Sequence, residues 1–506
     1  MSDQVSRRGF LQGTAAGTVL AGLGDVGFLS QLPQVSADEP VLNPNAVRLN
    51  PEIEPIVRLL EDTPRDQLLE KVAARIKEGL TYREVLAALL LAGVRNVQPR
   101  PVGFKFHAVL VVNSAHLASQ ASPPEHRWLP IFWALDEFKS AQAADVKEGN
   151  WTMSQLSDSS IPAPEKAKQA FIDAMNQWDE SAADAAVAGL VRSAKPDEIY
   201  ELFFRFGARD FRDIGHKAIF VANSRRTLDV IGWQHAEPIL RSLTYALQHH
   251  EGGNPFNGDA AADQPWKRNR NLAAKLRTDW TSGQIDSKAT TDFLSVLRTA
   301  SDEDACAAAV ETINRGVSPQ SIWDALFAGA GELLMRQPGI VALHAVTSTN
   351  ALRYAFAETT DDETRRLMLL QNVAFVPLFR NAMTIRGKVG DVRIDTLEPA
   401  SVTAGAGSVK EILDEISSNR PMAAQKLLGY LSNNPEPQEL IDAARLMVFF
   451  KGTNSHDYKY SSAVFEDFQH VSPEWRNRFL ASSAYQLRGS MDKENPLVPR
   501  TRAAFG

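Results

Sequence analysis

Apolar residues recur at helical spacing along most of the chain. Between residues 66 and 80 they fall three or four positions apart, which places them on one face of a helix. Thr81 and Glu84 then have the spacing of a capping box, in which each residue satisfies a free backbone N–H of the other. The pattern predicts a second helix from Val85 to Val94.

Proline opens several of the other predicted helices. Pro196, Pro319 and Pro437 are each followed by helix-forming residues. Proline is favoured in a first helical turn because its missing N–H would have no partner there. The alternation typical of a strand is scarce, and its best example, residues 388–395, is short. The pattern therefore predicts an all-α fold.

Two pairs of segments within the chain are similar. The segments of the first pair are residues 81–113 and 318–350, and those of the second are residues 216–247 and 456–487. Each contains a histidine at a matching position, so the chain is predicted to be duplicated, with a first half over residues 38–284 and a second over 285–506. Helical repeats bury their apolar faces against one another, so the halves are expected to pack together. The polar run 252–277 is the predicted linker.

The matching histidines are the strongest candidates for chemistry: His107, His216, His344 and His456. Imidazole binds Zn, Fe, Cu and Ni and is a general base near neutral pH. We hypothesise that the four converge on one interior cavity, with His216 and His456 as catalytic or ligand groups and His107 and His344 as substrate contacts. A purely structural role, copied by duplication, and a metal site are the alternatives. No H-E-x-x-H or E-x-x-H pair distinguishes the metal site.

Four other residues are weaker candidates. Lys459 lies one helical turn after His456, and we assign it a catalytic role in stabilising an anion or a carbonyl oxygen. His235, Glu237 and Arg353 are assigned to substrate binding. His235 and Glu237 would also suit a site of two histidines and a carboxylate. The ordinary alternatives are a solvated lysine and surface ion pairs.

Composition and motifs argue against several classes of function. Lys and Arg number 54 against 61 Asp and Glu, and the net charge of −7 argues against a nucleic-acid partner. The single cysteine, Cys306, excludes an internal disulfide and a cysteine-based zinc site. The sequence contains neither a complete dinucleotide fingerprint nor a phosphate-binding loop.

The first 37 residues have the pattern of an export signal. Arg7 and Arg8 precede a short apolar run, and small residues follow near Ala37. Paired arginines indicate the twin-arginine route, so we expect the export machinery as a partner and a periplasmic or secreted location. No apolar run is long enough to span a bilayer, so stable membrane insertion is not expected.

The histidine-containing units resemble the questin oxidase-like family. The resemblance is carried by residues 104–118, 216–226, 237–245, 344–353 and 456–459. Asn454 replaces an acid usual in that family, and Lys217 replaces a small or apolar residue. The resemblance implies an all-α oxidoreductase that inserts oxygen beside a ketone of an aromatic polyketide (Baeyer–Villiger type) with NADPH and O₂. Because an exported enzyme would not meet NADPH, a non-haem metal is the alternative cofactor. A helical-repeat scaffold without chemistry is the competing function.

Overall fold

The computed structural model describes residues 45–506 apart from 250–253, 255–257, 404 and 406. The predicted export signal, residues 1–37, therefore lies outside the described residues. Residues 45–506 form one compact unit. Within the described part of the chain the regular elements are helices, and the β-type pairing consists of two isolated bridges, Ala46 to Ser154 and Gln284 to Val317. This confirms the all-α prediction. None of the described helices combines the length and the apolar character needed to cross a membrane.

The α-helices of the first part of the chain are α2 (Glu54–Asp62), α3 (Arg65–Lys77), α4 (Tyr82–Asn96), α5 (His107–Gln120), α6 (Trp128–Lys147), α7 (Pro164–Gln177), α8 (Glu180–Ser193), α9 (Pro196–Gly207), α10 (His216–Ile231), α11 (Ala236–Leu247) and α12 (Gln264–Ala273). Short 3₁₀ helices are η2 (Phe104–Phe106), η3 (Pro124–His126), η4 (Asp158–Ser160), η5 (Arg212–Gly215), η6 (Trp233–His235) and η7 (Ala261–Asp263).

The helices of the second part are α13 (Ser287–Thr299), α14 (Asp302–Asn314), α15 (Pro319–Arg336), α16 (Ile340–Glu358), α17 (Asp362–Thr384), α18 (Ser408–Ser418), α19 (Arg420–Asn433), α20 (Gln438–Lys451), α21 (Ser455–Asp467), α22 (Pro473–Ser482) and α23 (Leu497–Phe505), with the 3₁₀ helices η8 (Trp280–Ser282) and η9 (Ser483–Tyr485). The duplication into halves at residue 285 stays a prediction.

Local sequence signals account for several of these boundaries. The capping box at Thr81 and Glu84 is present, and it opens α4. Pro196 and Pro319 are the first residues of α9 and α15, whereas Pro437 immediately precedes α20. The polar run 252–277 was expected to be a linker. It contains helix α12 instead, which packs against α14 and α17.

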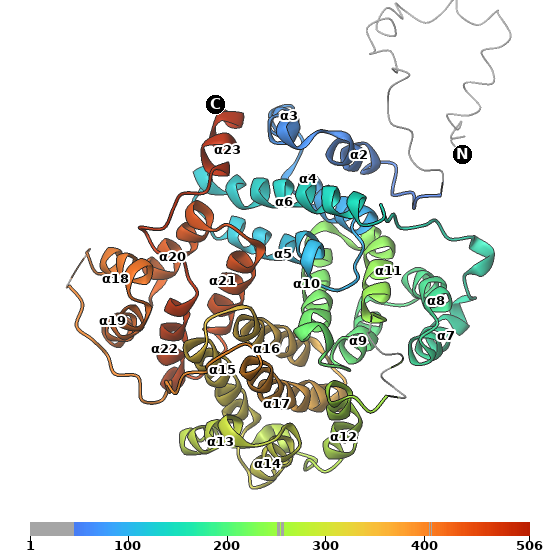
Figure 1. Ribbon diagram of the computed structural model, residues 1–506. Coiled ribbons are helices and arrows are strands. Elements are labelled where there is room, and N and C mark those ends of the chain that lie inside the picture. The colour runs from blue at the N-terminus through green and yellow to red at the C-terminus, as the bar shows by residue number, and fades with distance from the viewer. Residues whose placement is uncertain (1–44, 250–253, 255–257, 404, 406) are drawn as a thin grey trace, which may run out of the picture. The chain divides into compact units, whose positions relative to one another are not determined.

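Four helices form a ring in the middle of the described unit. Helix α10 packs against α5 and α16, and α21 packs against the same two helices from the other side. Figure 1 shows α5, α10, α16 and α21 around the centre, with α4, α6 and α11 packed outside them. Each ring helix has one recurring histidine at or near its N-terminal end. The ring thereby brings four side chains from distant parts of the sequence to one place.

Candidate functional site

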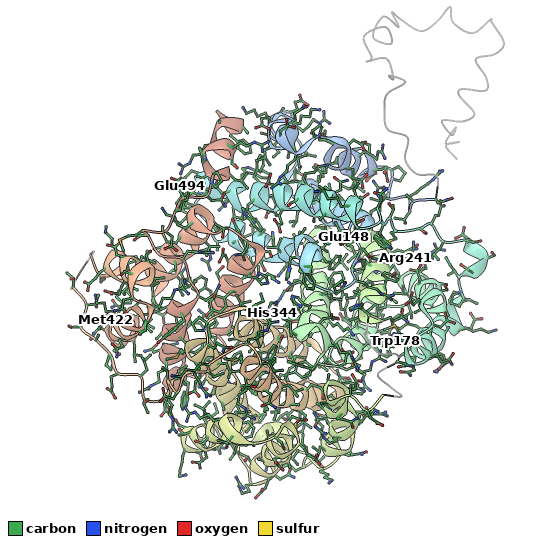
Figure 2. All side chains as sticks on the ribbon, viewed as in Figure 1. Glu148, Trp178, Arg241, His344, Met422 and Glu494 are labelled. Carbon is green, nitrogen blue, oxygen red and sulfur yellow. The ribbon has the colours of Figure 1, made fainter. Side chains whose placement is uncertain are left out.

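The four recurring histidines meet at one end of the ring. Their ligand-capable nitrogen atoms all lie within 4.8 Å of one another, and the label of His344 marks the place in Figure 2. The Nε2 atom of His216 lies 3.0 Å from Nε2 of His107 and 2.8 Å from Nε2 of His344. The ring centre of His456 is 4.4 Å from that of His107. His216 and His344 are buried, while His107 and His456 keep part of their surface exposed.

Backbone carbonyl groups orient three of the rings. The Nδ1 atoms of His107, His216 and His344 each contact a main-chain oxygen a few residues earlier in the chain. These oxygens belong to Phe104, Asp213 and Ile340, at 2.8, 2.6 and 2.6 Å respectively. A carbonyl oxygen can only accept, so each Nδ1 carries the proton of its neutral ring. The three Nε2 atoms therefore present lone pairs, and these face one another.

A cation held between the Nε2 atoms would relieve these short contacts. Two lone pairs 2.8 to 3.0 Å apart repel unless a proton or a metal ion lies between the nitrogen atoms. Burial, and then the Lys459 charge, holds the pKa of His216 well below its usual value. Burial lowers the pKa of His107 and of His344 in the same way, and it lowers the pKa of His456 to about 3. Because protonation is disfavoured, a metal ion is the cation that fits these residues.

Helix α21 contributes His456 and a buried lysine. The side chain of Asn454 caps this helix by accepting from the backbone N–H of His456 at 2.9 Å. Asn454 thus caps the helix at the position where the questin oxidase-like family usually has an acid. Among the described residues, neither Nε2 of His456 nor Nζ of Lys459 has a hydrogen-bond partner, although both atoms are buried. Burial lowers the pKa of Lys459 to about 7. A free amine therefore lies one turn from a free imidazole nitrogen.

Strained backbone holds two of the orienting carbonyl groups. Phe104 has a φ of 47° and Asp213 a φ of 55°, in the left-handed region that residues with a Cβ rarely adopt. Gly103 precedes the first of these turns with a φ of 135°, and a Cβ there would lie 3.3 Å from Cε1 of His216. Gly215 follows the second, and a Cβ there would collide with Oγ of Ser348. Glycine therefore leaves room for the His216 ring beside the first turn and for Ser348 beside the second.

A polar layer lies inside the ring, beyond the histidines. It consists of one side chain from each ring helix, six or seven residues after its histidine: Asn113, Asn223, Asn350 and Ser462. Asn113 Nδ2 donates to Asn223 Oδ1 at 3.4 Å, and Ser462 Oγ donates to the carbonyl oxygen of Ser114 at 3.3 Å. Sequence reasoning did not identify this layer as functional. The recurrence of a small polar residue at a fixed distance from each histidine is the signal that could have found it.

Two cavities follow the ring away from the histidines. The inner cavity, of about 20 Å³, is lined by Lys459 and the polar layer. The outer cavity, of about 750 Å³, is lined by Tyr354 and Phe465 among others. Arg226 and Glu466 line both cavities.

The remaining candidates lie apart from the cluster of four. His235 is at the end of η6 beside Gln234, and burial lowers its pKa. Glu237 pairs with Arg192 at 3.2 Å. Arg353 lies 5.7 Å from the ring centre of Trp323. Their assignment to substrate binding stays a prediction.

Comparison with protein-family models, with curated proteins and with solved structures finds nothing that matches this chain.

Proposed function

We propose that this protein is a metal-dependent oxidoreductase whose centre is one transition-metal ion held by Nε2 atoms of the four histidines. One observation carries the proposal: backbone carbonyl groups direct the Nε2 lone pairs of His107, His216 and His344 toward one another, with contacts of 2.8 and 3.0 Å. An all-nitrogen ligand set suits Fe, Co, Ni, Cu or Zn, whereas Mg and Ca prefer oxygen. Iron or copper bound there would supply one-electron redox chemistry.

Residues around this ion would orient its histidine ligands and donate a hydrogen bond to a group bound there. The carbonyl groups of Phe104 and Asp213 fix which nitrogen of His107 and of His216 faces the centre. The Lys459 amine has no partner among the described residues, so it is free to donate a hydrogen bond to a negatively charged oxygen at the centre. A scaffold would gain nothing from facing lone pairs and a buried amine, both of which cost stability.

The redox assignment rests on the resemblance to the questin oxidase-like family, with a small organic molecule as substrate. The proposal includes export by the twin-arginine route, which carries folded proteins. That route is compatible with a metal loaded before export. It is less compatible with NADPH, so we favour the metal as the cofactor.

Metal analysis of the purified full chain tests the proposal. We expect about one iron or copper ion per chain, and at least a tenfold lower occupancy in His216→Ala and His344→Ala. His126→Gln is the matched control, because this histidine packs against Phe450 and lies outside the cluster. Substoichiometric iron, copper, zinc, cobalt and nickel after reconstitution would refute the metal centre. One tightly bound zinc ion with no redox-active metal would refute the oxidoreductase assignment.

A further inference from the structure

The inner cavity begins beside the histidine cluster. Lys459 lines it and lies one helical turn after His456 on α21. Lys459 is only 3% exposed, and among the described residues its amine has no hydrogen-bond partner. The polar end of this side chain thus lies between the cavity and the imidazoles, where most interior positions of a helix ring would be filled by apolar groups.

The wall of the inner cavity is mixed: polar side chains from all four ring helices alternate with the apolar Leu117, Ile219, Ala351 and Ala463. The four ring helices each contribute one neutral polar side chain: Asn113, Asn223, Asn350 and Ser462. A space of about 20 Å³ with several polar neighbours suits a single water molecule. Molecules that pass here must therefore be narrow, such as water or a linear triatomic ion.

An ion pair lies in the wall that the inner and outer cavities share. The Arg226 guanidinium on α10 donates to both carboxylate oxygens of Glu466 on α21 at 2.8 Å. It also donates to Oδ1 of Asn350 on α16 at 3.2 Å, and Asn350 Nδ2 donates back to Glu466 at 2.9 Å. Three of the four ring helices are thus tied together at this point. The Glu466 side chain is 32% exposed and that of Arg226 12%, so the pair lies between the interior and the outer cavity.

We propose that the interior of the helix ring is the route by which small ligands reach the histidine centre, and that the Arg226–Glu466 pair is its gate. This inference rests on the proposed metal centre. It adds a size limit: the route admits water-sized and linear triatomic ligands, and larger molecules remain in the outer cavity. The opposing route is direct entry past the partly exposed rings of His107 and His456.

Azide binding to the cobalt(II)-loaded full chain separates the two routes. The rate is followed by stopped-flow absorption of the cobalt bands. Glu466→Ala removes the gate's carboxylate, and we expect azide to bind at least fivefold faster. Ala463→Leu places a larger side chain in the inner cavity, and we expect binding to slow at least tenfold. Val464→Leu is the matched control for overpacking, since the neighbouring Val464 is buried outside the cavity lining.

The cobalt content shows whether a negative result contradicts the interior route or the metal centre itself. If Glu466→Ala and Ala463→Leu both hold one cobalt per chain and bind azide within twofold of the wild-type rate, the interior route is wrong. If Ala463→Leu does not fold, Glu466→Ala alone decides, because entry past His107 and His456 leaves its rate unchanged. A wild-type chain that takes up no cobalt would refute the proposed metal centre, and this inference with it.

Discussion

Lys459 is a basic residue whose amine is buried. Burial lowers its pKa to about 7, whereas the unfolded chain has a pKa near 10.5. Between these values the unfolded chain holds one more proton, so the free energy of unfolding rises with pH. For the metal-free protein we expect a rise of about 2 kcal/mol from pH 7 to pH 9 that Lys459→Met lacks.

Urea unfolding of both proteins at pH 7, 8 and 9 measures this difference. Lys71→Met is the control, because Lys71 is exposed on α3 and its loss should leave the pH dependence unchanged. Parallel pH profiles for the wild type and Lys459→Met would mean that the amine is solvated rather than buried.

Residue types indicated which side chains meet at the candidate site, but not how they are oriented. The four histidines and Lys459 could be selected from the sequence because they recur or lie one turn apart. The carbonyl groups of Phe104 and Asp213 could not, since every residue has a carbonyl and only the left-handed backbone at these positions directs it to a ring.

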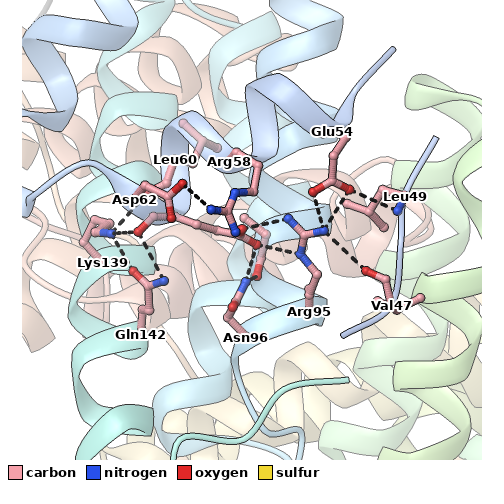
Figure 3. A network of polar contacts seen from close by, with 12 residues as sticks. Val47, Leu49, Glu54, Arg58, Leu60, Asp62, Arg95, Asn96, Lys139 and Gln142 are labelled. Carbon is pink, nitrogen blue, oxygen red and sulfur yellow. Dashed lines mark hydrogen bonds and ion pairs between the residues drawn. The ribbon is translucent and has the colours of Figure 1, made fainter. Parts of the chain in front are cut away.

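At the scale of elements, a buried arginine holds α2 on α4. The Arg95 side chain on α4 is 1% exposed and pairs with Glu54 and Glu61 of α2, each at 2.7 Å, as Figure 3 shows. Its Nη1 also donates to the carbonyl oxygen of Val47. The Glu61 side chain is 5% exposed, so without Arg95 its charge would be buried without its main partner.

Arg95→Met is therefore expected to lower the free energy of unfolding by about 3–5 kcal/mol. Chemical denaturation measures this loss. Adding Glu61→Gln should restore part of it, because the second change removes the unpaired charge. Arg75→Met is the control, since Arg75 forms an exposed pair with Glu78. A loss below about 1 kcal/mol would mean that the network behaves like a surface ion pair.

The helices differ in how well their positions could be predicted from the sequence. Helix α4 was predicted because it combines a capping box with a continuous apolar run. The polar composition of residues 252–277 predicted a linker where α12 forms, and only Pro265, Asn269 and Ala273 of this helix are buried. Asn269 Nδ2 donates to Oε1 of Gln371 at 2.8 Å. Local sequence patterns cannot predict such a contact, because its partners lie far apart in the chain.

At the scale of the molecule, residues 45–506 are one compact unit. If residues 1–37 are an export signal, their removal leaves the contacts of this unit unchanged. We expect the thermal midpoint of the chain without residues 1–37 to stay within about 2 °C of that of the full chain. Calorimetry on both proteins tests this, and an unfolded truncated chain would contradict the signal assignment.

The site exists only when the whole unit is assembled, because its four histidines lie on helices that begin between residues 107 and 455. The sequence repeat could indicate that these histidines are equivalent, but their convergence depends on the ring that the packing creates. A metal ion bound to all four should therefore stabilise the folded unit as a whole. At a free concentration one hundred times Kd, this amounts to about 2.7 kcal/mol.

Scanning calorimetry with and without added metal should accordingly show a rise in the thermal midpoint of several degrees, reversed by a chelator. His344→Ala removes the most deeply buried ligand and should abolish most of the rise. His126→Gln should keep it, because that ring contacts Phe450 rather than the cluster. An equal rise in the wild type and His344→Ala would place the metal elsewhere, since a four-ligand site that links the ring helices cannot lose one of its buried ligands without losing this coupling.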